Sequence, residues 1–353
     1  MKPRERILRS IAFDEVDRPP LLGGWIRSAP QLQMIAGMSA EKFWSDPESG
    51  TLRAHTRLRP DGLLDFFVPP SQDVYRKVTH ETLRQRGAYQ EPEQVKEYVE
   101  NLPSLDQLTN SFDVDALVRK TVAEIQGMQG KLGETVWMPA RWDACCRFAW
   151  FGIFGYESYL MFLALYPEHA RRLFEYSAEE ARLKSVGYAR AIRVTNSVPL
   201  VLVGEDICGG RGPMVSPDFL REYYFPQVKR SLEPLYEAGI KVVWHSDGNI
   251  WPIIDQIIDT GVHGFQGFQE ELGFTLADLV KKRTVRGERL LIFGNVSVTE
   301  TLPFGTPEDV KREIDETIQV VGKRGLFILT SNAIGPEVPI DNILTLFDYP
   351  RSL

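Results

Sequence analysis

Residues 240–249 read Ile240-Lys241-Val242-Val243-Trp244-His245-Ser246-Asp247-Gly248-Asn249. They begin as a short apolar run rich in β-branched residues, which predicts a buried strand, and residues 250–258 then show apolar side chains at helical spacing. A strand that ends in His-x-Asp-Gly ahead of a helix carries polar side chains at its carboxyl end, where α/β folds place their chemistry. The alternative is a polar turn in which Asp247 caps the helix and Gly248 adopts a positive φ.

Apolar segments of strand length alternate with helical segments along the whole chain. Strands are predicted at residues 21–26, 61–68, 135–139, 198–203, 240–245, 262–265, 290–293 and 325–329. Helices are predicted at residues 4–13, 40–58, 113–128, 145–195 (in two or three pieces), 216–238, 250–258, 275–282, 306–321 and 340–349. This alternation indicates parallel strands joined by crossover helices.

Eight predicted strands favour a closed barrel over an open sheet. We expect an α/β fold, a distorted TIM-type (β/α)8 barrel with extra N-terminal helices, as a single domain over residues 1–353. An N-terminal helical segment covers residues 1–19, and residues 71–91 are a candidate hairpin or flap. An open dinucleotide-binding sheet would carry a glycine-rich turn after its first strand, and the chain has neither that motif nor a Walker loop.

The composition excludes several classes of protein. The chain has 353 residues, 43% hydrophobic and 25% charged, with a net charge of −7 and no block of Lys and Arg, so nucleic acid is not an expected partner. No apolar run approaches the roughly 18–20 residues of a membrane span, and the N-terminus has no signal-peptide core. We therefore expect a cytoplasmic protein without membrane contact, and the oligomeric state is left open. The three cysteines are expected to be buried free thiols.

Polar side chains follow five or six consecutive predicted strands. Because the carboxyl ends of barrel strands meet on one face, we expect these side chains to gather there. They are Trp142, Asp143, Glu205, Asp206, His245, Asp247, Gln266, Gln269, Asn295, Ser331 and Asn332. Aromatic residues close to these strand ends are candidates for the wall of a cofactor or substrate pocket, although a single ring of this kind more often belongs to the core. They are Trp25, Trp142, Trp244 and Phe265.

His245 and Asp247 are two residues apart at a strand end, so both side chains can point to the same side. An imidazole and a carboxylate can hold a divalent metal, and Glu205, after the preceding strand, is the candidate third ligand. Nitrogen and oxygen ligands of this kind suit zinc and leave a position open for substrate. The alternative is a His–Asp pair that acts as acid or base without metal.

Several longer motifs are spread over nearly the whole chain. They are Arg4-Glu5-Arg6-Ile7-Leu8 with Asp17-Arg18-Pro19-Pro20, Gly204-Glu205-Asp206, Gly212-Pro213-Met214-Val215-Ser216-Pro217, His245-Ser246-Asp247-Gly248-Asn249, Gly294-Asn295-Val296, Gly305-Thr306-Pro307-Glu308-Asp309-Val310 and Pro336-Glu337-Val338-Pro339-Ile340-Asp341-Asn342-Ile343. Through them the chain resembles the uroporphyrinogen decarboxylase superfamily. That superfamily includes the decarboxylase itself and zinc-dependent methyltransferases that act with corrinoid proteins. The resemblance implies a distorted TIM barrel.

The departures from the decarboxylase favour the methyltransferase branch. The decarboxylase has an Arg-rich segment for the carboxylates of its substrate, whereas residues 23–30 here hold one arginine. Its conserved aspartate falls near Val68, and its carboxyl-terminal histidine aligns with Asn332. Thiol-methylating relatives hold zinc with His and two cysteines, and Asp247 and Asn332 stand at the cysteine positions here. A zinc site without thiolates is harder, which suits an ether or phenolic oxygen better than a thiol.

The resemblance leads to a specific hypothesis with two alternatives. We expect a methyltransferase that takes a methyl group from a small O-methyl donor, such as an aryl ether, and delivers it to a corrinoid on a partner protein. His245, Asp247 and Glu205 would hold zinc, and Asn295 or Asn332 would orient the donor. One alternative is a decarboxylase that acts on a tetrapyrrole or a smaller carboxylate through Asp206 or His245. The other is a non-catalytic barrel that binds a corrinoid or tetrapyrrole.

Overall fold

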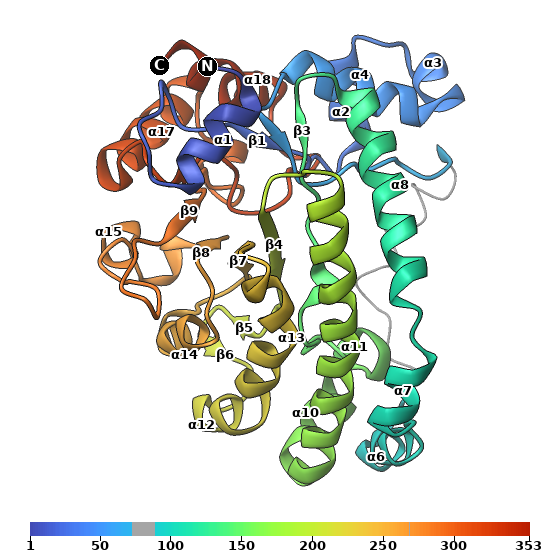
Figure 1. Cartoon of the computed structure of the whole chain (residues 1–353). Coiled ribbons are helices and arrows are strands. Elements are labelled where there is room, and N and C mark those ends of the chain that lie inside the picture. Colours follow the sequence, from blue (N-terminus) through green and yellow to red (C-terminus); the bar gives the residue numbers. More distant parts are fainter. Residues whose placement is uncertain (73–88, 268) are drawn as a thin grey trace. The chain divides into compact units, whose positions relative to one another are not determined.

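The computed structural model describes residues 1–72, 89–267 and 269–353, and these residues form two compact units (Figure 1). The first unit contains residues 1–72, 124–140 and the described part of 264–353, and the second contains residues 89–123 and 141–263. Most of the candidate flap at residues 71–91 falls on residues 73–88, outside the described part of the chain. The single-domain assignment stays a prediction.

The first unit contains two sets of three parallel strands. β1 (Leu22–Gly23), β2 (Gly62–Leu63) and β3 (Val136–Trp137) pair in that order. β8 (Gly264–Gln266), β9 (Leu291–Phe293) and β10 (Leu326–Phe327) form the second set. A parallel bridge joins Leu21, the residue before β1, to Ile328, the residue after β10.

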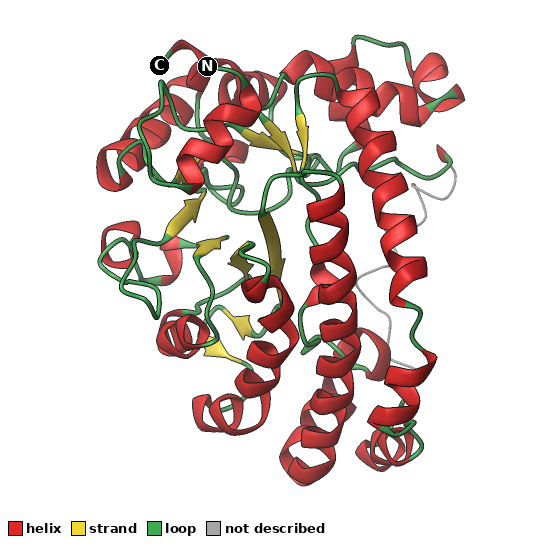
Figure 2. Cartoon of the chain, viewed as in Figure 1, coloured by secondary structure: helices red, strands yellow, loops and turns green. Residues whose placement is uncertain are grey.

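Helices surround the strands of the first unit (Figure 2). They are α1 (Pro3–Ile11), α2 (Ala29–Ala36), α3 (Ala40–Ser45), α4 (Pro47–Leu58), η5 (Glu270–Leu272), α15 (Leu276–Leu279), α16 (Thr301–Phe304), α17 (Pro307–Val321), α18 (Ile340–Asp348) and η6 (Tyr349–Ser352). The start of α17 is fixed locally, because Thr306 and Asp309 form a capping box and Pro307 occupies the first turn.

A buried ion-pair network ties the N-terminal segment to β2. The carboxylate of Asp61, which is 2% exposed, pairs with the guanidinium groups of Arg6 and Arg18. It also accepts a hydrogen bond from the backbone N–H of Leu21. Removing one partner of such a network leaves a buried charge without compensation, so Asp61 fixes how the chain enters β1.

The second unit is built on one long parallel pair. β4 (Leu200–Gly204) pairs with β7 (Lys241–His245) over its full length, with Gly204 opposite His245. β5 (Cys208–Gly209) and β6 (Gly212–Pro213) form a short antiparallel hairpin directly after β4. The interior of both long strands is apolar and buried, which is the pattern of a parallel sheet covered on both faces.

The helices of the second unit include the longest helix described, α11 (Pro167–Val194, 28 residues), which packs against α13 (Phe225–Glu237). The others are α6 (Pro92–Glu100), α7 (Leu105–Ser111), η2 (Trp142–Ala144), α9 (Phe151–Phe154), α10 (Tyr156–Leu165), α12 (Pro217–Phe219), η3 (Leu220–Tyr224), η4 (Trp251–Ile253) and α14 (Ile254–Asp259). α8 (Val114–Leu132) begins in the second unit and ends in the first.

Each of the eight predicted strand segments overlaps an observed strand, and the predicted parallel pairing is confirmed within each unit. The predicted helix at residues 40–58 is divided at Asp46, because Asp46 caps α4 and Pro47 starts it. The region at residues 145–195 forms three helices, and the three cysteines are buried and free. The hairpin β5–β6 and the helices α2, α6, α7 and α16 were not predicted, since each is short or follows a polar stretch.

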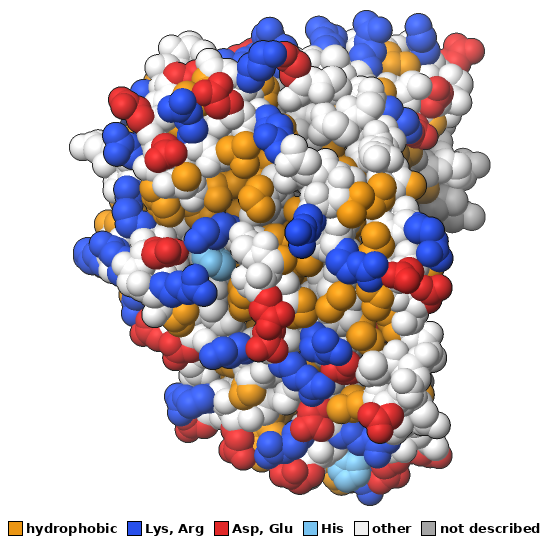
Figure 3. Space-filling model, viewed as in Figure 1, with side chains coloured by type: hydrophobic (Ala, Val, Ile, Leu, Met, Phe, Trp, Pro, Cys, Tyr) orange, Lys and Arg blue, Asp and Glu red, His pale blue; other side chains and the backbone are white. Residues whose placement is uncertain are grey.

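None of the described helices combines the length and the apolar character needed to cross a membrane. On the face shown in Figure 3, the Lys and Arg side chains are interspersed with Asp and Glu and form no continuous basic stripe.

Candidate metal and ligand site

The candidate site lies where β4 and β7 end. The two strands run in parallel with Gly204 opposite His245, and the backbone N–H of Glu205 donates to the carbonyl oxygen of His245. The backbones approach closely here, since a Cβ on Gly204 would lie 2.0 Å from that oxygen. Residues that follow the two strands are therefore held side by side at one edge of the sheet.

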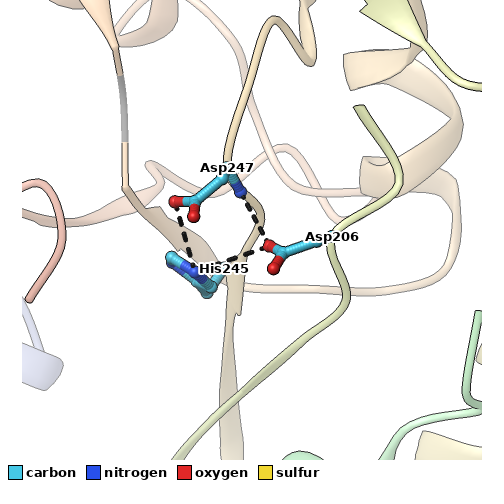
Figure 4. Close-up of side chains that lie close together, drawn as sticks. All are labelled: Asp206, His245 and Asp247. Carbon is cyan, nitrogen blue, oxygen red and sulfur yellow. Dashed lines mark hydrogen bonds and ion pairs between the residues drawn. The ribbon is translucent and has the colours of Figure 1, made fainter. Parts of the chain in front are cut away.

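Asp206, His245 and Asp247 point toward one another at this edge (Figure 4). Nε2 of His245 lies 3.6 Å from Oδ1 of Asp247 and 3.9 Å from Oδ1 of Asp206. The backbone N–H of Asp247 donates to Oδ1 of Asp206 at 3.1 Å, which holds the two carboxylates in one place. The imidazole is 12% exposed, whereas the two carboxylates are 48% and 38% exposed, so ions can reach the cluster from solvent.

The loop after His245 is shaped by Gly248 and Asn249. Gly248 has φ +84°, and a Cβ there would lie 2.7 Å from the carbonyl oxygen of Cys208 in β5. The N–H of Asn249 donates to the carbonyl of Gly209, and its side chain accepts from the N–H of Trp251 at the start of η4. The side chain that accepts a hydrogen bond from the first turn of η4 is therefore that of Asn249. The carboxylate of Asp247 lies in the cluster instead.

Glu205 was predicted as the third metal ligand, whereas the structure brings Asp206 together with His245 and Asp247. The carboxylate of Glu205 lies on the other side of the strand end, where Oε2 accepts hydrogen bonds from the N–H groups of Phe148 and Ala149. Burial raises the pKa of the Glu205 carboxyl from 4.5 to about 7, although the two backbone N–H groups oppose that rise. Consecutive residues on extended chain face opposite sides, which explains why only one of the two carboxylates joins the cluster.

Of the aromatic candidates, Trp142 adjoins the cluster. Its ring, carried by η2, meets the imidazole of His245 edge to face with 5.5 Å between centroids, and the side chain remains 39% exposed. Trp244, by contrast, has no exposed surface and belongs to the core, since alternation along β7 turns it away from the side of His245. Trp142 is therefore an exposed aromatic residue beside the cluster in the second unit.

A cavity of about 190 Å³ lies beside Trp142 within the second unit. Its lining combines two indole rings with charged side chains of both signs. The lining residues are Trp142, Asp143, Cys145, Arg147, Trp150, Ser177, Glu180, Ala181, Lys184 and Glu205. Sequence reasoning missed its α11 wall, although Ser177, Glu180, Ala181 and Lys184 have the spacing of one helical face.

The remaining candidates, Asn295, Asn332, Trp25 and Phe265, belong to the first unit. Asn295 follows β9 and is 5% exposed, and its Oδ1 has no hydrogen-bond partner among the described residues. The Oδ1 of Asn332 accepts from the N–H of Ala333. Trp25 is 7% exposed and Phe265 is fully buried, so both pack in the core of their unit. The orienting role of the two asparagines stays a prediction.

The cluster fits a zinc ion by ligand type and by distance. The three ligand atoms of Asp206, His245 and Asp247 lie within 4.8 Å of one another. Two ligands at the usual zinc bond lengths of about 2.0–2.2 Å are about 3.3–3.6 Å apart in tetrahedral geometry, close to the two measured imidazole–carboxylate distances. One nitrogen and two carboxylate oxygens form a hard donor set, and a three-ligand site leaves a coordination position for substrate.

Comparison with known proteins gives a family and a fold. Residues 2–353 match the family model described as Uroporphyrinogen decarboxylase (URO-D). Solved structures match as well, among them a methyltransferase from Methanosarcina mazei with a TM-score of 0.65 and 17% sequence identity, covering 100% of this chain and 99% of that chain. No curated protein matches the chain. The predicted fold class, an α/β TIM-type barrel, is confirmed by the family and by this structural likeness.

Proposed function

Because the chain belongs to the uroporphyrinogen decarboxylase family, we propose that it is a methyltransferase of that family with a hard metal site. It moves a methyl group from a small O-methyl donor, such as an aryl ether, to a corrinoid carried by a partner protein. The observation that carries this proposal is the cluster of Asp206, His245 and Asp247 at the carboxyl ends of β4 and β7. The likeness to the M. mazei methyltransferase supports the same branch of the family.

The three clustered residues would hold zinc, and when bound the zinc would act as a Lewis acid toward the oxygen that leaves with the aryl group. Two carboxylates and one imidazole prefer hard oxygen partners to soft sulfur partners. This donor set therefore favours an ether or phenolic oxygen as the substrate group at the open position.

The protein side chains bring the donor and the site together. Trp142 offers an exposed aromatic ring against His245, which suits contact with a flat donor. The hydrogen bond from the Asp247 N–H to Asp206 keeps the two carboxylates from separating, so the ligand atoms are positioned before a metal or donor arrives. The corrinoid would reach the site on its partner protein.

The test of this function uses reduced free cobalamin as methyl acceptor and methoxylated benzoates as donors. The absorbance change on formation of methylcobalamin reports transfer. We expect transfer by the zinc-loaded protein and a loss of at least about 100-fold in His245→Ala, because removing a ligand abolishes the site. His169→Ala is the matched control, since His169 lies on the surface of the same unit and pairs with Glu100.

Two results would overturn the proposal. One is equal transfer by His245→Ala and the wild-type protein. The other is transfer that survives complete removal of metal by EDTA, which would leave His245 with an acid–base or structural role.

A further inference from the structure

We propose that a groove in the second unit, between α14 and the segment formed by η3 and α13, binds a free amino acid with an apolar side chain (Figure 1). The groove shares no residue with the metal cluster. Its lining includes Arg221, Phe225, Pro226, Lys229, Gln256 and Asp259. The ligand's carboxylate would lie at Lys229 and its ammonium group at Asp259 and Gln256. Its side chain would lie against Phe225.

The size of the groove fits one small molecule. Its volume is about 270 Å³. Pockets for drug-sized ligands measure roughly 300–1,000 Å³, and an engineered protein cavity of about 150 Å³ holds benzene. A single amino acid lies between these two sizes, so the groove can enclose its backbone groups and its side chain together.

Two charges of opposite sign line the groove without forming ion pairs. Neither Lys229 nor Asp259 makes an ion pair, with each other or with any other residue in the described part of the chain. The guanidinium of Arg221, by contrast, already pairs with Asp218 at 2.6 Å. A zwitterion would supply a partner to both unpaired charges at once. A simple anion or a simple cation would be attracted by one of them and repelled by the other.

The groove also carries acceptors that lack donors. Oε1 of Gln256 is buried and has no hydrogen-bond partner among the described residues. At the end of the wide turn η3 the N–H of Phe225 donates to the carbonyl of Leu220, five residues earlier, and Pro226 has no N–H. The carbonyl of Arg221 therefore lacks both of its usual helical donors, and wide turns of this kind are frequent at functional sites.

These acceptors match an ammonium group. Such a group has three N–H donors and no acceptor. The groove offers three acceptors for them, the amide oxygen of Gln256, the carboxylate of Asp259 and the carbonyl of Arg221. Gln256 and Asp259 are three residues apart in α14, so they lie on one face of that helix. The carbonyl of Arg221 points along its helix toward the next turn, where Phe225 also lines the groove.

The apolar part of the lining favours an apolar side chain on the ligand. Phe225 is 5% exposed, and the exposed ring of Pro226 follows it at the start of α13. Covering these rings removes apolar surface of both partners from water, which stabilises the complex. Lys229 is four residues from Phe225 on the same face of α13, so one ligand can reach both.

Calorimetry with the EDTA-treated full chain at neutral pH tests the inference. The probe is L-leucine, and three truncated molecules accompany it. They are 4-methylpentanoate, which lacks the ammonium group, 3-methylbutylamine, which lacks the carboxylate, and glycine, which lacks the side chain. We expect L-leucine to bind at least about 10-fold more tightly than each of them, because it alone meets both charges and the apolar wall.

Three variants test the assigned contacts. Lys229→Gln and Asp259→Asn should each weaken L-leucine binding by at least about fivefold, the effect of losing one partly exposed charged contact. Gln256→Leu should also weaken binding, but it should not lower the midpoint of urea unfolding, because the acceptor that it removes has no partner in the free protein. Glu237→Gln, an exposed residue at the other end of α13, is the matched control and should change binding less than twofold.

Three results would overturn the inference. One is that L-leucine fails to bind, and another is that a truncated probe binds equally well. The third is that Lys229→Gln and Asp259→Asn bind L-leucine like the wild type. Because the assay contains neither metal nor methyl acceptor, its outcome is independent of methyl transfer.

Discussion

Replacing Glu205 with Gln should stabilise the protein at alkaline pH and leave its stability nearly unchanged at acidic pH. Burial raises the pKa of this carboxyl from 4.5 to about 7, so between these pH values the folded chain binds more protons than the unfolded chain. The stability of the wild type therefore falls as the pH rises through that window. Gln has no charge to bury, and its side-chain oxygen can accept the same two backbone hydrogen bonds.

The size of the effect follows from the pKa. One pKa unit corresponds to about 1.4 kcal/mol, so the full rise corresponds to about 3 kcal/mol. Because the side chain is only partly buried and solvent screens part of this cost, we expect the free energy of unfolding of Glu205→Gln to exceed that of the wild type by about 2 kcal/mol at pH 8. At pH 4.5 the two proteins should differ little.

The assay is urea unfolding followed by circular dichroism in EDTA, at pH 4.5 and pH 8, for both proteins. Glu179→Gln serves as a control of opposite sign, because hydrogen bonding to Arg182 lowers the pKa of Glu179, so this substitution should destabilise the protein at pH 8. The reasoning is refuted if Glu205→Gln changes stability equally at both pH values, or if it destabilises the protein at pH 8.

Three further predictions test other parts of the structure. Asp61→Ala should lower the free energy of unfolding by about 3 kcal/mol in urea, because Arg18 loses its carboxylate partner and the nearly buried Arg6 keeps only Asp17. Gly248→Ala should reduce metal binding in equilibrium dialysis, because the added Cβ meets the β5 backbone, whereas Gly209→Ala, with open space at its Cβ, should not. Uroporphyrinogen should not be converted to coproporphyrinogen in a product assay. The one arginine of residues 23–30, Arg27, already pairs with the carboxylate of Asp65 at 2.6 Å. Turnover at about 1 s⁻¹ or faster would contradict this prediction.

The strands were predictable because buried parallel strands leave a clear signal in the sequence. Val201, Val203, Val242 and Val243 belong to short β-branched runs, and each run is followed by a polar or glycine residue where the strand ends. Such signals depend on local burial and are largely independent of distant contacts. The short hairpin β5–β6 has no comparable run, so its position was not predictable.

The choice between Glu205 and Asp206 shows where sequence reasoning stops. Both carboxylates follow the same strand, and either could face His245. The register decides between them, because Gly204 stands opposite His245 and side chains two residues further along face the same side. That register places Asp206 with Asp247 and turns Glu205 to the amides of residues 148 and 149. The register of two strands whose paired residues are 41 positions apart in the sequence cannot be read from either strand alone.

Trp142 and Trp244 illustrate the same limit for aromatic residues. Both lie near strand ends, and composition does not distinguish a pocket wall from a core residue. Trp244 is buried because its side chain faces the side of β7 opposite to that of His245. Trp142 is exposed, and it lies in η2, a short helix that follows β3 in the sequence. The cavity beside Trp142 was not predicted, since its other wall comes from α11 and the packing of that helix depends on tertiary structure.

The most direct test of the account is the zinc content of protein purified without chelator, measured by inductively coupled plasma mass spectrometry. The cluster of Asp206, His245 and Asp247 predicts one zinc per chain in the wild type and little or none in His245→Ala, with a folded protein in both cases. Glu205→Gln should keep its zinc, because that side chain lies outside the cluster. Wild-type protein without stoichiometric metal, or equal zinc in His245→Ala, would contradict the account.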